Sequence, residues 1–366
     1  MFKMKIIETP HSSYYSCAVS AYFTSPTTRS VDTTIMLNGT PTTTQAQAFG
    51  PLPPELLLNI LDQLVETCNN HHPVARSRFD KITKTLHSLT LVSRSVHPIA
   101  TEYLYSNCVW LDCPRVLGRF CTTLGLDHQH QATVQETRRP PKPTFSRYIM
   151  SMHISPIPTK NPWGDDWASS IRLPAIINLF NTIGPNLKRL HLNLSRFGFN
   201  WDVTDSQGSD IIDPNVYSNM LLLEELILSC DIVRHFPNPP PNIKRLAIVT
   251  DHFRDAEWTF YRSLPSLESL VLLWPDGRID KHIDTFFDLY EGKSIDIILV
   301  DMVTFDRTLV AIRDRESNDT VRIWEAYTPP GFGNTSDEWI WDQGAAGTLW
   351  DQKQRRIPWL SEIKGH

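Results

Sequence analysis

The central part of the chain repeats one short pattern of apolar positions, Leu-x-x-Leu-x-Leu, with isoleucine, valine or methionine in place of some leucines. Alternating apolar positions are typical of a strand that buries one face, so each copy predicts a short strand. The unequal spacing of the copies predicts connecting loops of different lengths. The copies occupy residues 149–154, 187–192, 223–228, 243–248, 267–272 and 295–300.

Between these copies the apolar spacing becomes that of an amphipathic helix, at residues 167–183, 255–264 and 280–290. One strand and one helix cannot bury their apolar faces alone, whereas stacked units can. The pattern resembles that of leucine-rich repeats and predicts an α/β fold. We expect an irregular solenoid with parallel strands, convex-side helices and the repeated leucines in its core, and a last strand at 320–327.

A helical pattern precedes the repeats. Pro53 and Pro54 suit a helix start because the first turn leaves its N–H groups without partners, and Glu55 complements the positive end of the helix dipole. Periodicity resumes at Leu86, and Pro98 is expected to start a further helix. The sequence therefore predicts three short helices, which by periodicity alone would be a plain cap on a larger domain. The first, about 54–65, has an apolar stripe formed by Leu56, Leu57, Ile60, Leu61 and Leu64.

The order of residues here closely resembles the F-box, the motif through which substrate receptors bind the Skp adaptor of Skp/cullin/F-box ubiquitin ligases. Two features depart from the motif: Val96 stands where many F-boxes have tryptophan, and the connection at about 66–85 is longer than usual. This insertion is polar and basic, so we expect a surface loop. The resemblance implies that ten residues touch the adaptor or support the contact: Leu52, Pro53, Glu55, Leu56, Ile60, Leu61, Leu64, Leu91, Val92 and Ser93.

The chain divides into four predicted regions: a disordered leader at 1–49, the F-box at 50–110, the repeats at 111–305 and a C-terminal cap or tail at 306–366. The resemblance to fungal F-box proteins with degenerate repeats covers roughly residues 51–305. Trp339, Trp341, Trp350 and Trp359 lie in the last region, and tryptophan is unfavourable in water. This region either closes the open end of the repeats, which we favour, or binds a partner.

Polar residues that alternate with the buried leucines are the candidates for binding a target protein. Blocks of basic and acidic residues alternate from strand to strand, a pattern that could recognise an oppositely patterned partner. A solvated surface without a partner explains the same pattern equally well. The candidate residues are Lys188, Arg189, His191, Glu224, Glu225, Lys244 and Arg245.

Composition narrows the function classes. The 366 residues include 35 basic and 40 acidic ones, a formal net charge of -5, which argues against a nucleic-acid partner. The sequence contains no apolar run long enough to span a membrane and no secretory signal pattern. Its six cysteines do not form a disulfide framework in so long a chain and suit reduced thiols. We therefore expect an intracellular protein of the cytoplasm or nucleus.

Motifs of enzymes are absent from the sequence: no Gly-x-Ser-x-Gly, phosphate-binding glycine loop or His-Glu-x-x-His occurs. Cys108, Cys113 and Cys121 with His128 and His130 suggest zinc by residue type, but their spacing matches no standard site. We expect no metal or cofactor. The prediction is a non-catalytic substrate receptor that binds the Skp adaptor, and through it a cullin, and an unknown target. The alternatives are a ligase-independent repeat scaffold and, third, a hydrolase with dispersed catalytic residues.

Overall fold

The computed structural model describes the following parts of the chain: residues 53–66, 72–126, 144–155, 173–194, 212–229, 231–249, 260–261, 263–273, 294–301, 320–329 and 336–357. The predicted leader and the predicted helix at 280–290 lie outside these residues, as does most of the predicted helix at 255–264.

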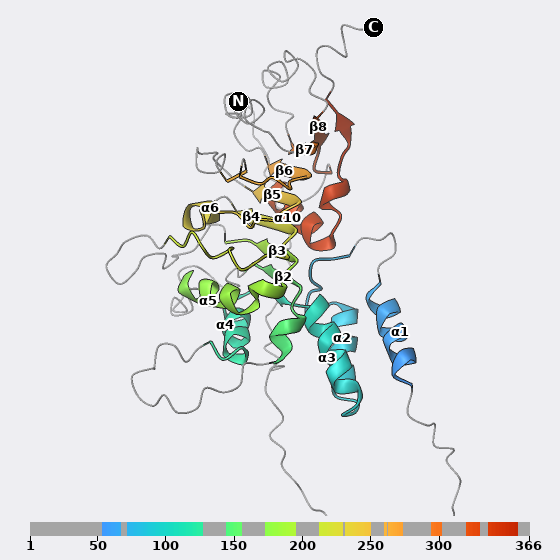
Figure 1. Cartoon of the computed structure of the whole chain (residues 1–366). Helices are drawn as coiled ribbons and strands as arrows, with labels where there is room; N and C mark the ends of the chain where they lie inside the picture. Colours follow the sequence, from blue (N-terminus) through green and yellow to red (C-terminus); the bar gives the residue numbers. More distant parts are fainter. Residues whose placement is uncertain are drawn as a thin grey trace, which may run out of the picture. The chain divides into compact units, whose positions relative to one another are not determined.

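One sheet organises these residues, and its nine strands follow one another in sequence order (Figure 1). Neighbouring strands are parallel from β1 to β8, and β9 runs antiparallel to β8. Each of the six predicted strands, and the predicted last strand, coincides with one of them. The strands are β1 Trp110–Leu111, β2 Ser151–Ile154, β3 Arg189–Leu192, β4 Glu225–Ser229, β5 Arg245–Val249, β6 Ser269–Leu273, β7 Ile295–Val300, β8 Val321–Ala326 and β9 Arg355–Arg356.

The fourth position of the first five copies of the repeated pattern forms a continuous apolar row across the sheet, which Ile297 of β7 and Ile323 of β8 extend. In the copy at 295–300 the fourth position is Ile298, which lies on the opposite face, so the predicted register of that copy is wrong by one residue. The register places the residues of the row side by side in successive strands, and all are buried. Since burying one such side chain contributes about 1.5–3 kcal/mol, the row alone explains why the strands stack in this register. Its members are Met152, Leu190, Leu226, Leu246, Leu270, Ile297 and Ile323.

Helices cover this face of the sheet, on the left in Figure 1. They are α4 Pro114–Thr123, α5 Leu173–Ile183 and α6 Asp231–His235. Phe180 of α5 packs edge-on against Phe236, which follows α6, and both are fully buried. The alternation of strand and helix along the chain therefore produces two layers around one apolar core.

The opposite face of the sheet is covered by the C-terminal segment. Helix α10 Ser336–Ala346 and the short 3-10 helix η7 Leu349–Asp351 place Trp339, Trp341 and Trp350 on the second face of the strands. This segment does add a strand at the end of the repeats, where closure was expected, and it also covers a sheet face that the sequence analysis did not predict. A short strand, β9, pairs with β8 there, while the tryptophans bury the sheet face.

Three helices form a separate small core beside the sheet: α1 Pro54–Val65, α2 Lys81–Thr90 and α3 Val96–Asn107. We call them the helical module. Leu57, Leu61 and Leu86 are its buried centre, and Val96 packs against them. Helix α3 begins two residues before Pro98, the predicted start. The end of α3 is attached to the segment before β2, where the Ser106 hydroxyl donates a hydrogen bond to the Tyr148 carbonyl.

The predicted surface loop at 66–85 is wrong in part. Residues from Lys81 to Thr85 belong to α2, whose first turn is capped by the Asp80 side chain accepting from the Ile82 N–H. Val74 and Ala75 are buried rather than exposed. Polar composition concealed this because only two small apolar residues are buried here, and the charged residues beside them, such as Arg76, are themselves partly buried.

The close approach of α10 to the sheet gives a testable prediction. A Cβ at Gly344 would lie 2.3 Å from Cδ1 of Ile227 and 3.0 Å from Cε1 of His191. Both neighbours are fully buried and have no free space to move into. We expect Gly344→Ala to lower the free energy of unfolding by about 1–3 kcal/mol, measured by urea denaturation.

Gly118 in α4 is the matched control, because a Cβ there meets nothing within 4 Å. We expect Gly118→Ala to stabilise the protein by about 0.5–1 kcal/mol through the higher helix propensity of alanine. Equal stability changes in the two variants would show that α10 does not pack closely on the strands.

Candidate functional site

Four large apolar side chains of the helical module are exposed to solvent. Leu56 and Ile60, one turn apart on α1, are 50% and 52% exposed, and Leu91 and Val92, between α2 and α3, are 71% and 66% exposed. Large apolar side chains exposed in such a group are typical of a protein-binding surface. We call these four residues the apolar ridge.

The local sequence explains why the ridge stays exposed. Consecutive leucines at 56, 57 and 58 point to different sides of α1. Leu57 and Leu61 are buried in the module's own core, and Leu64 and Val65 pack against it. Asp62, on the solvent-exposed side of α1, accepts a hydrogen bond from the Tyr103 hydroxyl of α3. Burial and this carboxylate raise the pKa of Tyr103 to about 12, so the hydroxyl keeps its proton and the helices stay joined.

The residues predicted to bind or support the adaptor fall into three groups. Leu52 lies outside the described residues. Leu61 is buried and Leu64 is half-buried, so in this structure they can support a contact from within the module. The others are exposed: Pro53, Glu55, Leu56, Ile60, Leu91, Val92 and Ser93.

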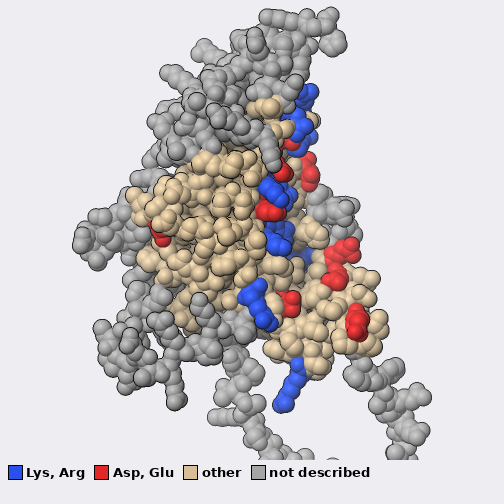
Figure 2. All heavy atoms as spheres, in the orientation of Figure 1, with Lys and Arg blue, Asp and Glu red and all other residues tan. Residues whose placement is uncertain are grey.

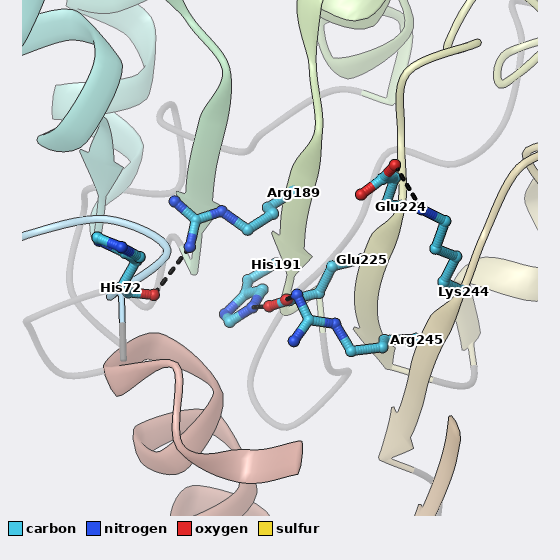
Figure 3. A network of polar contacts seen from close by, with 7 residues as sticks. All are labelled: His72, Arg189, His191, Glu224, Glu225, Lys244 and Arg245. Carbon is cyan, nitrogen blue, oxygen red and sulfur yellow. Dashed lines mark hydrogen bonds and ion pairs between the residues drawn. The ribbon is translucent and has the colours of Figure 1, made fainter. Parts of the chain in front are cut away.

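A row of charged residues crosses the sheet where its strands begin. Arg189, Glu225, Arg245 and Asp296 occupy the same register level in β3, β4, β5 and β7, with Ser269 of β6 between the last two. Figure 3 shows the Arg245 guanidinium beside the Glu225 carboxylate, at 2.8 Å, while Arg189 points toward His72. The row therefore alternates in charge, as the sequence predicted for these positions.

The histidines behind this row are buried and neutral. His191 lies 3.3 Å from Glu225 through Nε2, and its ring meets that of His153 edge-on at 6.0 Å. Burial lowers the pKa of His191 more than the Glu225 carboxylate raises it, and burial and the neighbouring His191 lower the pKa of His153. Burial raises the pKa of Glu225, but His191, Arg245 and Arg189 outweigh it and lower that pKa overall. Glu225 is therefore a buried carboxylate with cationic neighbours.

The predicted target-binding residues separate into an exposed and a buried set. Lys188 and Glu224 are exposed, and Lys244 pairs with Glu224 at 2.8 Å on the surface. Arg189 and Arg245 are partly exposed. His191 is buried beneath α10 and Glu225 is buried beside it, so neither can meet a partner directly in this structure.

A second charged cluster was missed by the sequence analysis. Asp296 of β7 accepts from the Trp324 indole at 2.9 Å and pairs with Arg322 and with Lys353, at 2.8 and 2.7 Å. The sequence did contain a signal for this cluster, because Asp296 lies between two isoleucines of a strand, which are both buried. A buried charge needs partners, so Asp296 predicts nearby cations without saying where they come from.

Figure 2 shows where the charges gather on the face seen in that view. Acidic and basic side chains alternate in a narrow band beside strands β3 to β8, whereas the adjoining broad face carries few charges. Alternation without a dominant sign suits a protein partner with a complementary pattern better than a uniformly charged polymer.

Metal chemistry finds no support in the parts of the chain that the structure describes. No group of three or more His, Cys, Asp or Glu side chains there could hold a metal ion. Cys113 and Cys121 are buried at α4, and burial raises the pKa of the half-buried Cys108 to about 11, which keeps its thiol protonated. His128 and His130 lie outside the described residues.

Comparisons with known proteins give no relative: the chain matches no family model and no curated protein. The F-box resemblance therefore rests on the residues themselves. Among the helices within the described ranges, none is long and apolar enough to cross a membrane.

The buried histidines predict a pH-dependent stability. As the pH falls from about 7.5 to about 5, an unfolded histidine with a pKa near 6.5 binds a proton while folded His153 stays neutral. The free energy of unfolding therefore falls by up to about 1.4 kcal/mol per pH unit for each such histidine. We expect His153→Phe, which keeps the stack on Trp110, to make this fall shallower in urea titrations.

A control occupies the same row of the sheet. Ile227→Val changes a buried side chain that does not titrate, so the wild-type pH slope should remain. If His153→Phe also retained that slope, the folded protein would not be keeping His153 neutral.

Proposed function

We propose that this protein is a substrate-recognition subunit of a Skp/cullin/F-box ubiquitin ligase. The helical module would be its F-box and would bind the Skp adaptor, which in turn binds a cullin. The sheet with its covering helices would be a degenerate leucine-rich-repeat domain that binds a target protein. Ubiquitin transfer would be carried out by the other subunits, and this chain would contribute proximity and orientation. That role is one of the cytoplasm or nucleus.

The observation that carries the proposal is the division of leucines within the helical module. Leu57, Leu61 and Leu86 close its core, while the apolar ridge remains exposed although the module lies against a large domain. A helix-in-groove contact needs both properties, a packed inner face and a free apolar outer face. A plain structural cap needs only the first, because exposed leucines add nothing to its stability.

Adaptor binding is tested by placing charges on the ridge. We expect Leu56→Glu with Ile60→Glu to weaken the binding of purified Skp adaptor by about 100-fold or more, because two buried side chains of this size contribute roughly 3–6 kcal/mol. Isothermal titration calorimetry measures the change, and circular dichroism reports whether the helices persist.

The chain offers a matched control in Leu221 and Leu222, which are 59% and 48% exposed and lie in the turn before β4, away from the helical module. Leu221→Glu with Leu222→Glu should leave adaptor affinity unchanged. Absence of binding by the wild-type protein, under conditions where another F-box protein binds, would refute the ligase role. A ligase-independent repeat scaffold would then be the better description.

Target binding is proposed for the charged residues directly before the charged row, the exposed Lys188 and Glu224 and the partly exposed Lys244, with Arg189 and Arg245 of the row partly accessible beside them. Charge reversal at Lys188 and Lys244 should remove specific proteins from a proximity-labelling profile while the adaptor is retained. An unchanged profile would show that the target binds elsewhere. Glu225 and His191 would act indirectly in this surface, by fixing the Arg245 guanidinium.

A further inference from the structure

The inserted segment His72–Arg76, which lengthens the connection after α1, passes between the helical module and the sheet. Val74 is fully buried and Ala75 is 3% exposed, so this segment is packed like a core element. A surface insertion would leave such residues in water. Its backbone therefore needs partners, and the partners identify what the segment joins.

Two hydrogen bonds attach the segment to the helical module. The Arg76 N–H donates to the Asn107 carbonyl at the end of α3, at 2.8 Å. The Arg76 guanidinium donates to the Val65 carbonyl at the end of α1, at 2.9 Å. Both acceptors are last-turn carbonyls without partners inside their helices, so Arg76 closes the ends of two helices at once.

Two further hydrogen bonds attach the segment to the other side. The Val74 N–H donates to the Ala345 carbonyl of α10 at 3.0 Å. The Arg189 guanidinium of β3 donates to the His72 carbonyl at 2.8 Å, as Figure 3 shows. The Arg189 side chain is partly exposed, so this bond lies at the edge of the buried region.

A glycine permits this contact. Gly347, directly after α10, has a φ of 77°. A Cβ at this position would lie 2.3 Å from the His72 carbonyl oxygen and 2.9 Å from its carbon. Backbone meets backbone there, so no side-chain rearrangement could make room for a larger residue.

We propose that His72–Arg76 is a clamp that fixes the orientation of the helical module relative to the sheet. The functional meaning of the clamp rests on the proposed ligase role. In that role Arg189 and Gly347 are positioning residues, which set where a bound target lies relative to the adaptor. A fixed orientation raises the effective concentration of one bound partner near the other.

The argument depends on there being two separate attachments. The module also meets the sheet directly at α3, where the Ser151 hydroxyl donates to the Ser106 carbonyl and Ser106 donates to Tyr148. One attachment at the end of a helix permits rotation about that point. The clamp adds a second attachment through α10 and β3, which restricts this rotation.

The test measures the distance between the module and the sheet by pulsed electron paramagnetic resonance in the full chain. Spin labels are attached to azide-bearing amino acids at Gln63 of α1 and Glu268 before β6, which are both exposed. We expect the wild-type protein to give one narrow distance distribution. Gly347→Ala, which forces His72 away, and Arg189→Met, which removes its donor, should each lose this narrow component and broaden the distribution.

Matched controls separate the clamp from general effects. Gly125 has a φ of 73° and open space around a Cβ, so Gly125→Ala carries the backbone strain of Gly347→Ala without touching a clamp. Lys188→Met removes a neighbouring exposed cation that makes none of these bonds. Both controls should keep the narrow wild-type distribution.

The outcomes decide between the alternatives. If folded Arg189→Met or Gly347→Ala keeps the wild-type distribution, the clamp is refuted. Should both variants fail to fold, hydrogen exchange of the wild-type protein decides, because a clamp protects the Val74 and Arg76 amides as strongly as those of α3, and rapid exchange would refute it. Adaptor affinity should be unchanged in both clamp variants. A wild type that binds no adaptor would refute the ligase role, while the distances would still decide the clamp.

Discussion

Burial of both faces of one parallel sheet is the constraint on which the rest of this structure depends. Parallel strands with apolar residues on both sides are stable only when each face is covered. The face that carries the repeated leucines is covered by the helices that connect the strands. The other face carries Ile227, Ala247, Val271 and Ile298, which no connecting helix within the described residues reaches, and the C-terminal segment covers it instead. The position of α10 thus follows from the composition of the strands.

The position of α10 explains why the second face of the sheet has charged residues at one level of the strands and apolar residues at the next. At the level of Arg189 and Glu225 the strands emerge from beneath α10, so guanidinium groups reach water while their carboxylate partners stay buried. Two residues further along each strand, the same face is fully sealed. Buried ion pairs add little net stability, because desolvation offsets their attraction. Their effect here is to fix which side chains stand at the boundary.

The sequence predicted the strand positions well because their signal is local, and in the first five copies the pattern of six residues also gave the face that packs against the helices. Helix α1 was predicted for the same reason. The pattern failed to give the face of β7, because the strand is apolar on both sides and alternation cannot then distinguish Ile297 from Ile298. The burial of His191 was beyond such reasoning, since the residues that cover it, around Gly344, are distant in the chain. Four tryptophans showed that the C-terminal region must be buried, but residue type does not say against what. The sequence analysis did not predict the burial of Val74 for a related reason: two apolar residues in a polar stretch give no periodicity.

The exposure of the apolar ridge is unusual when compared with the burial of apolar residues elsewhere in this fold. Everywhere else in the described sheet domain, rows of apolar side chains are matched by a covering element, even where this requires a glycine such as Gly344 at a close contact. The helical module is covered on its inner side by its own packing and by the inserted segment, yet Leu56, Ile60, Leu91 and Val92 remain uncovered. A fold that buries its other apolar rows this thoroughly leaves a ridge exposed at a cost in solubility. A docked partner removes that cost, which is the physical basis for assigning the ridge to binding.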